Sequence, residues 1–89
     1  MARFEIGSPE LATMAERQPN PEGLFQLGML YANGDDVDVD LVAAHKWFNL
    51  AALRGYSDAA YHRQQIAEEM SSADVAAAQR AAREWLSTH

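Results

Sequence analysis

The fold is decided by residues 23–59, which read GLFQLGMLYANGDDVDVDLVAAHKWFNLAALRGYSDA. In this stretch two apolar runs follow helical spacing, and an acidic loop separates them. The first run stops at Asn33-Gly34, and the second extends from Leu41 to Arg54 with Gly55 where a left-handed C-cap belongs. The apolar positions that define the two runs are Leu24, Leu27, Gly28 and Tyr31, then Leu41, Ala44, Trp47, Phe48, Ala51 and Ala52. The pattern predicts two helices.

Start and stop signals predict further helices on both sides. Ser8-Pro9-Glu10 opens a short helix through about Arg17, and Asp58 can cap a helix that reaches about Met70. Ser71, with Asp74 three residues later, opens a last helix to about Ser87. The predicted inner stripe of that helix is Val75, Ala78, Ala82, Trp85 and Leu86. Only residues 37–40 alternate with period two, so we predict an all-α chain.

Length and composition limit what the chain can do. Eighty-nine residues form at most one small domain, and a chain of this size buries only about 60–65% of its unfolded surface. A self-contained enzyme with a large internal cavity is therefore unexpected. Alanine supplies 17 residues, and because alanine favours helices and lets backbones approach closely, it indicates small helices packed tightly.

The net negative charge arises entirely from the first half of the chain. Residues 1–40 carry two basic and eight acidic side chains, whereas residues 41–89 carry five of each. This balance argues against nucleic-acid partners and anionic membrane surfaces. No apolar run is long enough to span a bilayer, and no export signal is evident. We expect a cytoplasmic protein if the chain is full length, or a periplasmic one if a signal peptide has been removed. Without cysteine there is neither a disulfide nor a thiolate zinc site.

The stretch 23–59 resembles the Sel-one-like repeats (SLR), which are relatives of the tetratricopeptide repeats (TPR) and are built from antiparallel helix pairs. The resemblance implies antiparallel helix pairs stacked as a short right-handed α-α superhelix. Gly23, Asp36 and Asp38 depart from the family, which usually has alanine, glycine and proline there. The repeat-defining positions match without a gap; they are Leu27, Gly28, Leu30, Tyr31, Asn33, Gly34, Val37, Asp40, Ala44, Lys46, Trp47, Phe48, Ala51, Ala52, Gly55 and Ala59.

The resemblance divides the chain into three parts: an extension with a short helix at 1–20, the repeat at 21–57, and a degenerate repeat with capping helices at 58–89. A second repeat starts at Ala59 but fails at once, because Arg63 and Gln64 replace the expected Leu-Gly pair. Residues 69–85 resemble a closing segment of some bacterial members. The side chains expected to face water there, as on a terminal unit, are Arg63, Gln64, Gln65, Glu68, Glu69, Gln79, Arg80, Arg83 and Glu84.

No motif for catalysis, a metal or a cofactor stands out. Asp36, Asp38 and Asp40 alternate like the first ligands of a calcium loop, but Leu41 and Trp47 replace its required glycine and glutamate. We expect instead that Asp40, or else Asp38, caps the helix that follows. The three histidines, which are not spaced as metal pairs and which we expect on the surface, are His45, His62 and His89.

The sequence therefore predicts a noncatalytic protein-interaction module that acts as an adaptor or scaffold. A peptide or partner helix, with a basic one favoured by the acidic loop, would bind the concave face formed by the first helix of each pair. Phe25, Met29 and Ala32 form a second apolar line, which is either covered by Leu11, Met14 and Ala15 or left open as a shallow groove. The candidate contact residues are Phe25, Gln26, Met29, Asn33, His62, Gln65 and Glu69.

Two alternatives stay open. The chain is expected to be a monomer or a weak homodimer, and a symmetric dimer would bury Phe25 and Met29 at its interface. A small hydrolase or metal-dependent enzyme would use the acidic loop with His45 or His62, and such an activity would require tight metal binding.

Overall fold

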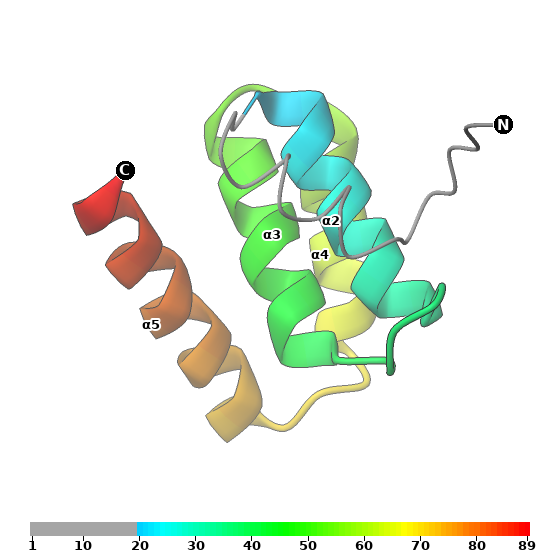
Figure 1. The fold of residues 1–89 in the computed structure, drawn as a ribbon. Coiled ribbons are helices and arrows are strands. Elements are labelled where there is room, and N and C mark those ends of the chain that lie inside the picture. Colours follow the sequence, from blue (N-terminus) through cyan, green and yellow to red (C-terminus); the bar gives the residue numbers. More distant parts are fainter. Residues whose placement is uncertain (1–19) are drawn as a thin grey trace, which may run out of the picture.

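The computed structural model describes residues 20–89 as an all-α chain (Figure 1). Its helices are α2 (Pro21–Asn33), α3 (Leu41–Leu53), α4 (Ser57–Ala67) and α5 (Ser72–Thr88), and this part of the chain contains no strand. The predicted fold class is confirmed. No helix in residues 20–89 is long and apolar enough to cross a membrane. The short helix expected near residues 8–17, with its covering side chains Leu11, Met14 and Ala15, lies outside the described residues.

Side-chain caps fix where three of these helices begin. Asn20 Oδ1 accepts a hydrogen bond from the Gly23 N–H at 2.7 Å, ahead of α2. Asp40 Oδ1 accepts from the Ala43 N–H, and Ser71 Oγ from the Asp74 N–H, each at 3.0 Å. These contacts satisfy N–H groups that have no partner within the helix. The capping roles predicted for Asp40 and Ser71 are confirmed.

The cap predicted for Asp58 is wrong. The helical turn already begins with a hydrogen bond from the Ala59 N–H to the Tyr56 carbonyl, so Tyr56 occupies the N-cap position and makes no side-chain cap. Asp58 lies in the first turn of α4, where the positive end of the helix dipole favours its charge. The helix also ends earlier than predicted, at Ala67, because residues 68–70 form a turn.

Two residues between α2 and α3, one of them in the acidic loop, adopt left-handed backbone conformations. Gly34 ends α2 with a φ of 74°, and Asp36 follows with a φ of 61°. Glycine adopts such angles freely, whereas an L-residue pays about 1–2 kcal/mol. The loop closes where the Asp40 N–H donates to the Tyr31 carbonyl at 3.0 Å. Asp36, which stands where the family usually has glycine, thus adopts a left-handed conformation at some cost.

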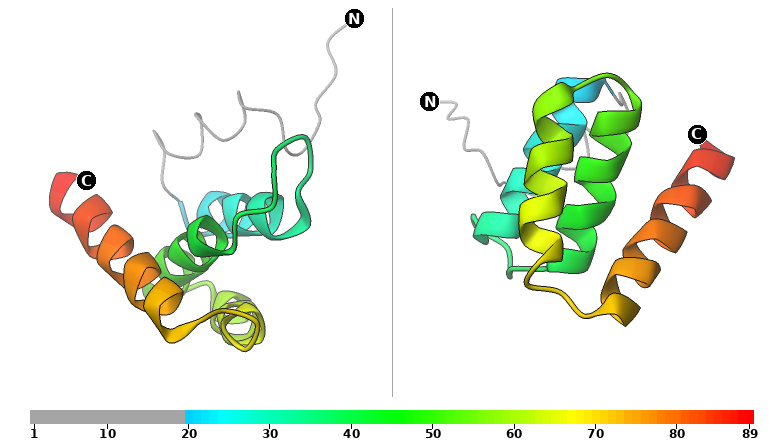
Figure 2. Two further views of the ribbon diagram at one scale, coloured as in Figure 1. Left: turned by 90° about the horizontal axis from the view of Figure 1, so that it is seen from below. Right: turned by 180° about the vertical axis from the view of Figure 1, so that it is seen from behind.

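The central helix is α3, which packs against α2, α4 and α5 (Figure 2). Where α2 crosses α3, Gly28 lies directly against Phe48, and a Cβ atom at position 28 would overlap the phenyl ring. The missing side chain therefore allows the close approach of α2 and α3. The fully or nearly fully buried apolar residues are Leu24, Leu27, Leu30, Ala44, Trp47, Phe48, Leu50, Ala51, Ala59, Ala78, Ala82 and Trp85.

The last helix, α5, packs on α3, and its packing on α4 is slight at most. Figures 1 and 2 show α5 diverging from α4 after their shared connection. Trp85 holds α5 in place by meeting the Trp47 ring edge to face, with centroids 5.9 Å apart. The inward position predicted for Leu86 is wrong: it is 40% exposed, because it follows Trp85 by one residue and points about 100° away around the helix.

Candidate protein-binding surface and end pocket

Four rings join α2 to α4 over one face of α3. Phe25 stacks on Tyr56 with centroids 4.6 Å apart, and its ring lies 5.1 Å from that of His62. The Phe48 ring contacts both of these rings. Its centroid lies 5.6 Å from that of Phe25 and 5.5 Å from that of His62. We call Phe25, Phe48, Tyr56 and His62 the aromatic cluster. It brings together two of the predicted contact residues, Phe25 and His62, from positions far apart in the sequence.

The predicted contact residues are not equally open to solvent. Phe25, Met29 and His62 are half-buried, and the first two pack against the core. Gln26 on α2 is also half-buried. The exposed members of the set are Asn33, Gln65 and Glu69. These exposed side chains are therefore better sites for testing binding than Phe25, whose ring contributes to packing.

The surface position predicted for His45 is wrong. Its side chain is only 3% exposed, and its Nδ1 atom is buried with no hydrogen-bond partner within residues 20–89. Periodicity indicated one buried face for α3, but three helices surround it, so the adjoining face is buried as well. Arg63, also expected to be exposed, is half-buried and donates to Asn49 Oδ1 at 2.6 Å.

Burial of His45 predicts a pH-dependent stability. Desolvation lowers the pKa of its imidazole below the ordinary value of 6.5, and the Arg63 guanidinium lowers it further. The unfolded chain then takes up the proton at a higher pH than the folded chain. The free energy of unfolding should accordingly fall as the pH drops from 7 through about 6.5, by at most about 1.4 kcal/mol per pH unit from this group.

Urea unfolding followed by circular dichroism between about pH 5 and pH 7 measures this dependence, since this window lies above the ordinary range of carboxyl titration. His45→Gln should remove the component that His45 contributes, whereas His89→Gln, at an exposed position, should leave it. If the wild type and His45→Gln show the same slope, the assignment to His45 is incorrect.

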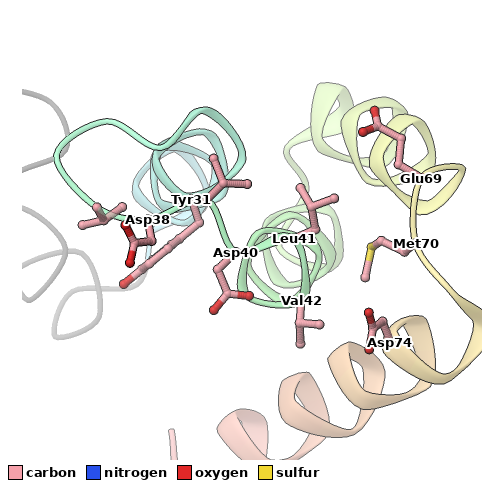
Figure 3. Close-up of a pocket in the computed structure, with 10 residues that line it drawn as sticks. Tyr31, Asp38, Asp40, Leu41, Val42, Glu69, Met70 and Asp74 are labelled. Carbon is pink, nitrogen blue, oxygen red and sulfur yellow. The ribbon is translucent and has the colours of Figure 1, made fainter.

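A pocket of about 550 Å³ opens at the end of the molecule where α2 and α4 stop and α3 and α5 begin. Figure 3 shows Met70 and Asp74 facing Leu41 and Val42 across it. Tyr31 and the acidic loop form another side. Within residues 20–89 no group of three or more histidine, aspartate or glutamate side chains is placed to hold a metal ion.

Sequence reasoning missed several residues of these two sites. Tyr56 completes the aromatic cluster, and its place directly after the helix-ending Gly55 was an available signal. The acidic loop drew attention to Asp38 and Asp40, but no local sequence pattern indicated that Met70 or Asp74 would line a pocket. Those two line the pocket only because the connection between α4 and α5 folds back to the start of α3.

The architecture defines the class of the protein. Two helices joined by a short loop meet at a glycine without space for a side chain, and a third helix follows after the left-handed Gly55, with a φ of 101°. Repeats of helix pairs stack in this manner in TPR-like helical repeat proteins. The described chain belongs to that class.

The family follows from comparison with known proteins. A family model for the Sel1 repeat matches residues 21–56, which comprise α2, α3 and the turn before α4. Residues 21–56 therefore match the Sel1 repeat, in agreement with the resemblance of residues 23–59 to the Sel-one-like repeats. No curated protein and no solved structure matches the chain. The Sel1 repeat suggests a role in protein–protein interaction, and such repeats are typically noncatalytic.

Proposed function

We propose that this chain is a noncatalytic adaptor or scaffold that binds a peptide or partner helix across α2 and α4. The aromatic cluster is the observation that carries the proposal, because it holds these two helices together and leaves Phe25 and His62 only half-buried. In this proposal residues 21–57 form the repeat and residues 58–89 close it. The Sel1 family supports an interaction role.

The side chains of this surface suit binding to a protein or peptide partner. Half-buried Phe25 and Met29 offer apolar contact area, and the exposed Asn33, Gln65 and Glu69 supply polar groups beside it. Protein interfaces commonly combine an apolar centre with a polar rim. Methionine, which is unbranched and polarizable, adjusts readily to differently shaped partners.

Selection of binding peptides from a displayed library tests the proposal, with affinities then measured by calorimetry. Gln65→Lys, on the exposed side of α4, should weaken a selected peptide by about tenfold. The matched control is Gln79→Lys, an exposed glutamine on α5 outside the proposed surface, which should change the affinity by less than about twofold.

Two results would count against the proposal. Equal effects of Gln65→Lys and Gln79→Lys would place the bound peptide elsewhere. A library that yields no binder, combined with a doubled mass by light scattering at high concentration, would favour self-association instead.

A further inference from the structure

The end pocket is lined by apolar side chains and by carboxylates. Val39, Val42 and Met70 supply apolar surface, and Val39 is 58% exposed. The carboxylates that line the same pocket are Asp38, Asp40, Glu69 and Asp74, and among the lining residues within 20–89 there is no lysine, arginine or histidine. A partner that fills this pocket must therefore offer both an apolar segment and positive charge.

Two of the carboxylates remain unengaged by the described chain. Asp40 already accepts the Ala43 N–H, and Asp74 lies in the first turn of α5, where the helix dipole partly balances its charge. The side chains of Asp38 and Glu69 are exposed, and their carboxylates form no hydrogen bond or ion pair with any residue between 20 and 89. A cation entering the pocket would gain most from these two.

We propose that the end pocket binds an arginine or lysine side chain of a partner peptide. The inference rests on the proposed interaction function and specifies the chemistry of the partner. The aliphatic stem of such a side chain covers apolar surface while its charged end stays at the rim. A bare metal ion fits less well, because it would not use the apolar lining residues and no three ligands converge there in the described chain.

Charge complementarity also favours a basic partner at long range. The chain has a formal charge of −6, and the acidic loop beside the pocket holds four of its carboxylates, Asp35, Asp36, Asp38 and Asp40. Complementary charge speeds encounter and suppresses wrong partners, and this effect weakens as salt screens it.

The direct test uses a short capped peptide in which two arginines flank a leucine, and an otherwise identical peptide in which citrulline replaces arginine. Citrulline keeps the shape of arginine but has no charge. In an NMR titration of the isotope-labelled full chain, the arginine peptide should shift the amide signals of Val39, Val42 and Met70. It should bind about tenfold more tightly than the citrulline peptide. The difference should shrink as salt rises from about 0.1 M to about 1 M, which shortens the Debye length from about 10 Å to about 3 Å.

Matched variants distinguish the effect of the pocket carboxylates on binding from the effect of the overall charge. Asp38→Asn combined with Glu69→Gln should weaken the arginine peptide by about tenfold. Asp35→Asn combined with Glu68→Gln makes the same two chemical changes at exposed neighbours that do not line the pocket, and should weaken it by less than about twofold. Circular dichroism checks that both variants keep their helices.

Equal losses in the two variants, or equal binding of the arginine and citrulline peptides, would overturn the proposal. So would signal shifts confined to residues outside the pocket. These failures differ from failure of the interaction function itself. If library-selected peptides still respond to Gln65→Lys while arginine has no advantage over citrulline, the interaction function stands and the basic-side-chain pocket does not.

Discussion

Replacing Trp85 with alanine is expected to lower the free energy of unfolding by about 3–5 kcal/mol. The Trp85 side chain is only 6% exposed and meets Trp47 edge to face. Because α5 packs on α3 and hardly on α4, no second helix within residues 20–89 compensates for the lost contact. Small domains are typically stable by only about 5–15 kcal/mol, so this loss would be a large share of the total. Urea unfolding followed by circular dichroism measures the change.

Two further substitutions identify the cause of that loss. Leu86→Ala, on the same helix but at a 40% exposed side chain, should cost less than about 1 kcal/mol. Trp85→Phe should cost far less than Trp85→Ala, because it keeps a ring and removes a buried indole N–H that has no described hydrogen-bond partner. If Leu86→Ala were as damaging as Trp85→Ala, α5 would not be anchored as the structure indicates.

Features encoded locally could be predicted from the sequence. The caps at Asp40 and Ser71 and the left-handed glycines depend on residues within one turn of each other, so their spacing is sufficient to locate them. The packing role of Gly28 was also predictable, because a glycine inside an apolar helical run serves close approach more readily than helix formation.

Features that depend on the placement of distant helices could not be predicted. His45 looked exposed because periodicity describes one face of a helix, whereas α3 is covered by three neighbours. The contact between Phe25 and Tyr56 requires α2 and α4 to lie together across α3. The end pocket likewise needs Met70 to reach the start of α3, and no spacing along the chain encodes that approach.

Gly28→Ala is expected to lower the free energy of unfolding by about 1–3 kcal/mol, although alanine is the better helix former by about 1 kcal/mol. The new Cβ atom would overlap the ring of Phe48, which is 1% exposed and has little room to move. The steric overlap therefore predicts that Gly28→Ala lowers the free energy of unfolding, whereas helix propensity alone predicts that it raises it. Urea unfolding of the wild type and the variant decides between the two signs.

A double-mutant cycle with Phe48→Leu tests whether the ring itself is responsible. Phe48→Leu alone should destabilise the protein, because a smaller side chain leaves part of the space around position 48 unfilled. In that background the overlap at position 28 is relieved, so adding Gly28→Ala should cost about 1 kcal/mol less than it does in the wild type, or even stabilise the helix. Additive effects of the two substitutions would show that Gly28 is required for a reason other than its contact with Phe48.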